Sequence, residues 1–282
     1  MGKKSLKAVL ALLIAIGIVL AGCSKKEDEK SEDTAKGKGS DKGNVTLKVG
    51  AAAVPHAEIL EHIKPELKKE GVDLDIVVLD SEGELNPALH EKEIDANFFQ
   101  HVPYLESVAA EKGYDFEPFT KVHVEPIGVY SEKVKTLDEL KEGAKIGIPN
   151  NPSNEYRALI LLEKNGLIKL KDGLKNYEAT PRDIAENPKK LEFVESEPPT
   201  LARALPDVDA AVINTNVVLE AGIDPESALV REDSDSPYAN IIVVRKGDSS
   251  REELKKLDKA LTSESVKKFI KEKYGSAVVP AF

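Results

Sequence analysis

Aromatic and amide side chains alternate in one segment of this chain, Asp95-Ala-Asn-Phe-Phe-Gln-His-Val-Pro-Tyr104. His101 and Tyr104 are three residues apart, so a helix over 101–112 would place them on one face. Clusters such as Phe98, Phe99 and Tyr104 belong more often to a core than to a site. Here Asn, Gln and His are interleaved with the aromatics, which favours a half-polar pocket around an apolar side chain.

A second segment, Pro149-Asn-Asn-Pro-Ser-Asn154, continues through Tyr156 to Arg157. Asn151 followed by Pro152 predicts an N-cap and the first position of a helix. Asn154 and Arg157 then share one face close to the positive end of that helix. This arrangement suits a bound carboxylate, which an arginine can hold with two hydrogen bonds. A surface arginine on a capped helix is an equally good interpretation of the segment alone.

Two more asparagines follow or begin predicted strands. Asn214 comes directly after the apolar run 210–213, and Asn240 precedes the apolar run 241–244. Each is either a ligand contact or an ordinary turn residue. The position of Asn214 matters because ligands of α/β sheets bind beyond the carboxyl ends of the strands.

Recognised catalytic patterns are missing from the sequence: it has no phosphate-binding Gly-x-x-x-x-Gly-Lys loop, no Gly-x-Ser-x-Gly elbow and no His-Glu-x-x-His pair. None of the five histidines are spaced i, i+4. We therefore expect no enzymatic activity, no metal site and no cofactor.

The elements that must position these side chains alternate between strand and helix. Strands are predicted near residues 45–50, 75–79, 96–98, 122–124, 128–130, 145–148, 191–194, 210–213 and 241–244. Helices are predicted between most of them, and two amphipathic helices near residues 251–261 and 265–273 follow the last strand. This alternation predicts an α/β fold, and about 238 residues make two lobes more natural than one.

The N-terminal segment has the features of an export signal. Lys3, Lys4 and Lys7 precede an apolar run over residues 8–22, which is shorter than the roughly 20 residues a membrane span needs. The end of the run, Leu20-Ala-Gly-Cys23, resembles a bacterial lipobox. We predict a signal peptide over 1–22, a lipid on Cys23, and a flexible polar tether over 23–44 on the extracytoplasmic face of the cell membrane.

Composition limits the remaining classes. The net charge of −10 argues against nucleic-acid binding, because nucleic-acid recognition needs a basic face. Cys23 is the only cysteine, so no disulfide can form within the chain.

Taken together, four segments closely resemble the methionine-binding lipoproteins of the NlpA family. They are residues 95–104, 149–154, Ala211-Val-Ile-Asn214 and Ser236-Pro-Tyr-Ala-Asn240, and they occur in the family's order. The likeness extends from about Val45 to Phe282. It implies a two-lobed periplasmic-binding-protein fold of type II, with the ligand in the cleft between lobe 1 (45–126 plus 239–282) and lobe 2 (127–238).

The resemblance also implies roles for single residues. Phe99, His101 and Tyr104 would line the thioether pocket, and Asn154 and Arg157 would hold the carboxylate. The remaining polar contacts, including those to the amino group, would come from Asn214 and Asn240.

The chain departs from the family pattern at two positions. Glu82 stands where the family usually has tyrosine, within Asp80-Ser-Glu-Gly-Glu84, and Tyr156 stands where it often has glycine. A Glu82 that points inward would pair with a cationic group of the ligand, and a Tyr156 beside Arg157 would tighten the pocket. Both side chains could equally face solvent at the rim.

The resemblance implies an extracytoplasmic, monomeric solute-binding lipoprotein that captures methionine and delivers it to an ABC importer permease. Another amino acid or a short methionine-containing peptide is the alternative ligand, because Glu82 and Tyr156 depart from the pattern. An extracytoplasmic hydrolase would need a nucleophile or metal that the sequence does not display. A structural lipoprotein or adhesin would not need a pocket for a zwitterion.

Overall fold

The computed structural model describes residues 43–79, 81–174, 177–233 and 236–282. The predicted signal peptide, Cys23 and nearly all of the predicted tether lie outside these residues. Among the helices of the described part, none has the length and apolar character needed to cross a membrane.

The strands of the described residues form two main sheets and one small one. The six-stranded sheet has the order β13-β4-β12-β3-β1-β2. Its strands are β1 Val45–Ala51, β2 Val72–Val78, β3 Ala96–His101, β4 Phe116–Val124, β12 Ala239–Arg245 and β13 Val279–Pro280. β1 runs parallel to β2 and β3, whereas β12 runs antiparallel to β3 and β4.

The five-stranded sheet has the order β11-β5-β10-β6-β9, with β6 parallel to both β10 and β9. Its strands are β5 Gly128–Tyr130, β6 Lys145–Pro149, β9 Glu192–Ser196, β10 Ala210–Ile213 and β11 Val230–Arg231. The small sheet pairs β7 Lys169–Leu170 with β8 Ile184–Glu186.

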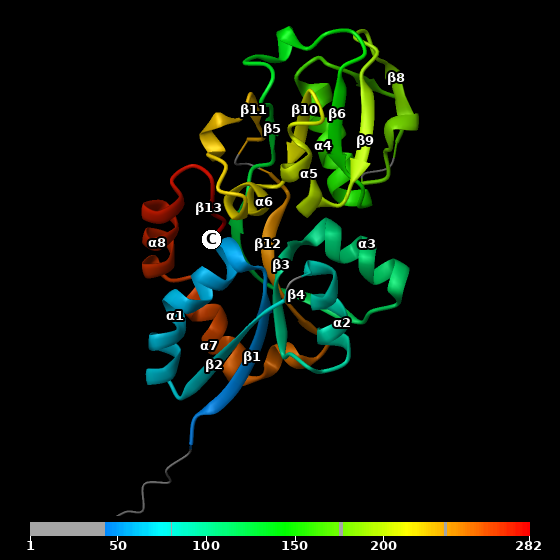
Figure 1. Ribbon diagram of the computed structural model, residues 1–282. Helices are drawn as coiled ribbons and strands as arrows, with labels where there is room; N and C mark the ends of the chain where they lie inside the picture. The colour runs from blue at the N-terminus through cyan, green and yellow to red at the C-terminus, as the bar shows by residue number, and fades with distance from the viewer. Residues whose placement is uncertain (1–42, 80, 175–176, 234–235) are drawn as a thin grey trace, which may run out of the picture. The chain divides into compact units, whose positions relative to one another are not determined.

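Helices cover both faces of the six-stranded sheet (Figure 1). One face carries α1 Glu58–Lys69, α7 Glu252–Leu261 and α8 Glu264–Tyr274; the other carries α2 Leu85–His90 and α3 Val102–Lys112. The periodicity that predicted α1, α7 and α8 corresponds to their buried leucines, isoleucines and valines. α1 ends before Gly71, whose φ of 81° lies in the left-handed region that glycine adopts without strain.

The five-stranded sheet also has a helix layer on each face. α4 Pro152–Lys164 packs with one hydrophobic cluster, and α5 Pro198–Ala204 and α6 Thr215–Glu220 pack around another. We call the six-stranded sheet with its helices the first lobe, and the five-stranded sheet with its helices the second lobe. Each lobe has its own buried core.

The chain passes between the two sheets twice. It leaves β4 at Val124 and enters β5 at Gly128, and it leaves β11 at Arg231 and enters β12 at Ala239. The carboxyl end of β3 and the N-terminal turn of α4 meet across the junction, where His101 Nε2 lies 3.1 Å from Asn154 Oδ1.

Two local predictions are corrected by the structure. The strand predicted over 122–124 is the end of the longer β4, which bulges against β12 at two places. His101 was predicted in the first turn of a helix, but it is the last residue of β3 and the N-cap of α3. Its ring nitrogen satisfies an otherwise free N–H at the start of the helix, and this favours the extended backbone.

Candidate functional site

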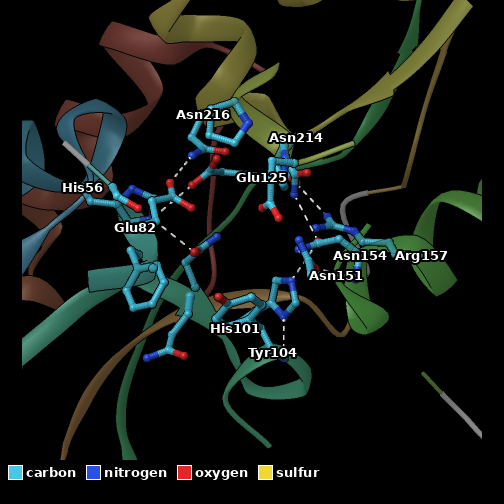
Figure 2. A pocket seen from close by; sticks show the side chains of 18 residues that line it. His56, Glu82, His101, Tyr104, Glu125, Asn151, Asn154, Arg157, Asn214 and Asn216 are labelled. Carbon is cyan, nitrogen blue, oxygen red and sulfur yellow. Dashed lines mark hydrogen bonds and ion pairs between the residues drawn. The ribbon is translucent and has the colours of Figure 1, made fainter. Parts of the chain in front are cut away.

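A cavity of about 170 Å³ lies between the two lobes (Figure 2). Every ligand-binding residue predicted from the sequence lines it: Glu82, Phe99, His101, Tyr104, Asn154, Arg157, Asn214 and Asn240. These residues come from both lobes and from segments more than 150 positions apart. The fold therefore gathers the predicted residues in one place, while their roles toward a ligand stay predictions.

One wall of the cavity is apolar. Phe99 and Tyr104 meet edge to face with ring centroids 5.8 Å apart, and Pro198 and Pro199 of α5 also line the cavity. Edge-to-face contact fixes the two rings relative to each other. This wall can receive an apolar side chain of moderate length.

Asn154 is the centre of a hydrogen-bond network that joins the lobes. The backbone N–H of Tyr104 donates to His101 Nδ1 at 3.2 Å, so the ring proton is on Nε2, which donates to Asn154 Oδ1 at 3.1 Å. Asn214 Nδ2 donates to the same oxygen at 3.1 Å, and Asn154 Nδ2 donates to Asn151 Oδ1 at 2.8 Å. Burial, together with the nearby Arg157 charge, lowers the pKa of His101 to about 3, so the ring is neutral at pH 7.

Arg157 is held more tightly than the sequence suggested. Its Nε and Nη2 donate to Glu232 Oε2 at 3.0 and 2.5 Å, and Nη2 also donates to the Glu125 carbonyl at 2.7 Å. The guanidinium carbon lies 4.3 Å from the Tyr238 ring centroid. The expected two-bond grip on a carboxylate is not available in this arrangement, but no described residue accepts a hydrogen bond from Nη1.

Two histidines and a carboxyl group form a buried cluster at the cavity, where His56 and Glu125 line the wall and His123 packs beside them. His123 Nε2 lies 2.7 Å from Glu125 Oε1, and His56 Nε2 lies 3.3 Å from the same oxygen and 3.1 Å from Asn240 Oδ1. Within the described residues, these three side chains bring their ligand atoms within 4.8 Å of one another, which gives a donor set that could hold a metal ion. Two of these atoms already have hydrogen-bond partners, because His123 Nε2 bonds Glu125 Oε1 and His56 Nε2 bonds Asn240 Oδ1.

Burial shifts the pKa of each group in this cluster toward favouring its uncharged form. It lowers the pKa of His56 to about 4 and that of His123 to about 3, and it raises the pKa of the Glu125 carboxyl. The charged form of each group is disfavoured because water is excluded from the buried cluster.

Glu82 faces the cavity from a 3-10 turn, Glu82–Glu84, of the first lobe. Asn216 Nδ2, at the start of α6 in the second lobe, donates to Glu82 Oε1 at 2.6 Å. Burial raises the pKa of Glu82 to about 8, with further contributions from the Glu125 and Glu220 carboxyls. In Figure 2, Glu82 and Asn216 lie toward the opposite end of the cavity from Arg157.

The second departure from the sequence pattern is not part of the cavity wall. Tyr156 packs against the core of the second lobe and meets Tyr177 edge to face at 5.6 Å. Tyr156 therefore does not tighten the pocket beside Arg157, which was one of the two interpretations of this residue.

Sequence reasoning did not single out five polar residues of the wall: His56, Ser81, Glu125, Glu197 and Asn216. Three of them, His56, Glu125 and Asn216, take part in the contacts described above. His56 follows the carboxyl end of β1 and Glu125 follows the end of β4, so the rule that ligands bind beyond strand ends could have identified both. Asn216 lies two residues beyond Asn214 and carried no separate signal.

Comparisons with known proteins identify the family of this chain. The sequence pattern of the family described as NlpA lipoprotein matches residues 47–282. The chain is 38% identical to the methionine-binding lipoprotein MetQ of Bacillus subtilis over 275 residues, which is 96% of each chain. It is 41% identical to the D-methionine-binding lipoprotein MetQ of Salmonella typhi over 266 residues, 93% of this chain and 92% of the relative.

Solved structures show the same fold. A nutrient-binding protein from Burkholderia cenocepacia, bound to methionine, has a TM-score of 0.81 and 44% identity over 84% of this chain and 100% of its own. An ABC-transporter periplasmic substrate-binding protein from Coxiella burnetii has a TM-score of 0.80 and 43% identity over 83% and 100%. The predicted two-lobed periplasmic-binding-protein fold is confirmed, and the chain belongs to the NlpA lipoprotein family.

Proposed function

We propose that this protein is a solute-binding lipoprotein that captures methionine outside the cytoplasm and delivers it to the permease of an ABC importer. The observation that carries the proposal is the cavity itself, which combines an aromatic wall, one guanidinium and several amides between two lobes. That set of groups complements an amino acid whose side chain is apolar.

The contacts suggest how the ligand would lie. Its carboxylate would accept from Arg157 Nη1, on the side where the N-terminus of α4 adds a favourable dipole. Asn214 Oδ1 is a buried acceptor that no described residue satisfies, so it suits an N–H of the ligand's amino group. The thioether would rest on Phe99 and Tyr104. No covalent step is needed for this role, so we infer binding and not catalysis.

Native mass spectrometry followed by calorimetry tests the ligand. The purified protein is expected to carry methionine or, once stripped, to bind it with one-to-one stoichiometry. If another amino acid or a methionine-containing dipeptide binds and methionine does not, methionine is not the ligand.

The anchor and location are part of the same proposal. We expect Cys23 to carry acyl chains, because stable anchoring needs more than one chain, and we expect the folded lobes to act as a monomer beside the permease. Cys23→Ser should move the protein from the membrane to the soluble fraction. A Cys23→Ser variant that stays membrane-bound would disprove the lipid anchor.

A further inference from the structure

Two imidazoles and one carboxyl group meet beside the cavity, and the proposed function does not use them as a unit. His56, His123 and Glu125 each bring one possible metal-binding atom to within 4.8 Å of the others. None of the three residues is more than 5% exposed. An ion held here would therefore lie in a buried site and not among loose side chains of the surface.

The three side chains come from backbone that the fold holds in place. His123 lies within β4, where it pairs with Asn240 of β12, and Glu125 follows the end of that strand. His56 lies in the turn that connects β1 to α1. Sites built on strands keep their geometry more precisely than sites on loops. The cluster is therefore largely arranged before any ion arrives.

The spacing of the donor atoms is close to that of a tetrahedral zinc site. Zn–N and Zn–O bonds of about 2.1 Å place two ligand atoms about 3.4 Å apart. His56 Nε2 lies 3.3 Å from Glu125 Oε1, which matches this separation. His123 Nε2 lies 2.7 Å from the same oxygen, so the ion would part these two atoms by about 0.7 Å. Coordination through Nε2 would put the ring proton of His123 on Nδ1, which is already buried without a partner among the described residues.

The charge of the cluster favours a cation. Within the described part of the chain, no lysine or arginine forms an ion pair with the Glu125 carboxyl group. The nearby Arg157 donates instead to the Glu125 backbone carbonyl and to Glu232. Buried carboxylates are stable when they are paired or coordinate a metal. A divalent cation would supply the missing charge and replace the hydrogen bonds that His123 and His56 make without it.

The donor set selects the class of ion. Two imidazoles and one carboxylate match the protein ligands of open zinc sites, in which a water or another group takes the fourth position. Mg²⁺ and Ca²⁺ prefer oxygen ligands, so two nitrogen donors disfavour them. His56 and Glu125 line the cavity, which gives the ion its route of entry and leaves room for the fourth ligand.

We propose that His56, His123 and Glu125 bind one Zn²⁺ ion, and that the ion and the solute exclude each other. His56 Nε2 cannot coordinate the ion and keep its hydrogen bond to Asn240 Oδ1, and Asn240 is a predicted contact of the solute. The inference goes beyond the proposed function, because zinc in this position would suppress solute capture.

Zinc binding is measured on the full-length chain in the Cys23→Ser background, so that its only cysteine does not compete for the ion. The protein is freed of metal with a chelator and of solute by dialysis, and is then titrated with Zn²⁺ in a calorimeter. We expect one zinc ion per chain, and no comparable binding of Mg²⁺ or Ca²⁺. Co²⁺ in place of zinc should give the visible absorption of a four-coordinate site, which tests the geometry without a substitution in the cluster.

His123→Gln removes a ligand that is not part of the cavity wall. It should weaken zinc binding more than about 100-fold, beyond the loss typical of changes outside the ligand shell, and retain methionine binding. In the wild type, free zinc at about ten times its dissociation constant should raise the apparent methionine dissociation constant about tenfold, as mutual exclusion requires. The same zinc concentration should leave methionine binding by His123→Gln unchanged. His90→Gln, at an exposed histidine outside the cavity, is the matched control and should bind zinc as the wild type does.

The outcomes are distinct. No zinc bound by the wild type, or equal zinc affinity in His123→Gln, would show that the cluster is a hydrogen-bonded group only and overturn the inference. Zinc binding that leaves methionine affinity unchanged overturns the mutual exclusion. If the metal-free wild type does not bind methionine, the proposed function is overturned, and the zinc titration and the Co²⁺ spectrum still decide the metal site.

Discussion

At the scale of single residues, Arg157 shows why a predicted ligand contact can also be structural. Its side chain is 3% exposed and that of Glu232 is 13% exposed, so the ion pair is largely shielded from water. Removing one partner of a buried pair leaves the other charge uncompensated, which is strongly destabilising. Binding and stability must therefore be measured separately at this position.

Arg157→Ala is expected to weaken methionine binding by about 2–5 kcal/mol, because the ligand carboxylate loses its charged partner. It should also lower the thermal midpoint of the ligand-free protein. Glu232→Gln is the comparison variant, since it keeps Arg157 and should lower stability more than affinity. Wild-type affinity in Arg157→Ala, measured by calorimetry, would remove this residue from the site.

His123 gives a prediction about acid stability. Its pKa is about 3 in the folded protein, against about 6.5 when unfolded, so the unfolded chain binds more protons below pH 6.5 and stability falls as pH falls. At pH 5 this loss is about 2 kcal/mol for one histidine. His123→Gln should reduce the loss between pH 7 and 5 by that amount in denaturant titrations.

His90, which is exposed, provides the control. His90→Gln should keep the acid sensitivity of the wild type. If His123→Gln is as acid-sensitive as the wild type, the buried ring is not the source of the loss.

At the scale of elements, the N-terminus of α4 combines a structural cap with the site. Asn151 Oδ1 accepts from the Asn154 backbone N–H at 3.2 Å and from its side-chain Nδ2 at 2.8 Å. The predicted cap at Asn151 and first helical residue at Pro152 are confirmed. The cap therefore also sets the rotamer of the residue at the centre of the interlobe network.

Asn151→Ala is expected to cost about 1 kcal/mol of folding stability, as loss of a cap does, and to weaken ligand binding as well. Ser263→Ala removes the corresponding cap of α8, where Ser263 Oγ accepts from Val266 N at 3.4 Å, away from the cavity. The Ser263→Ala control should lose folding stability but keep the ligand affinity of the wild type. Chemical denaturation and calorimetry on both variants would show whether the two caps behave differently, and equal affinities would contradict the coupling.

At the scale of the whole molecule, side chains of the two lobes meet across the cavity. His101 and Asn154 join β3 to α4, and Glu82 and Asn216 join the first lobe to α6. A ligand that touches both lobes favours the closed arrangement only by its higher affinity for that arrangement. We expect the connection from β4 to β5, residues 125–127, to act as a hinge.

Small-angle scattering should therefore give a smaller radius of gyration with saturating methionine than after the ligand has been stripped. Asn216→Ala, which removes one interlobe hydrogen bond, should give a still larger radius of gyration for the ligand-free protein. An unchanged radius with binding confirmed by calorimetry would indicate a rigid, preformed cavity.

The sequence by itself determined most of the secondary structure, the α/β class and the identity of eight residues that share one cavity. Period-two and helical patterns predict elements because burial of one face dominates local folding, and caps such as Asn151-Pro152 are local in sequence. The order of the four motifs along the chain indicated the family.

Only the tertiary structure decided how those residues interact. The partner of Arg157 is Glu232, 75 positions away, and the partner of Glu82 is Asn216, 134 positions away. The packing of the lobes also showed that Glu82 faces the cavity and Tyr156 does not, a question that the sequence left open. Burial and charge pairing depend on contacts between distant segments, and no periodicity or motif encodes which segments will meet.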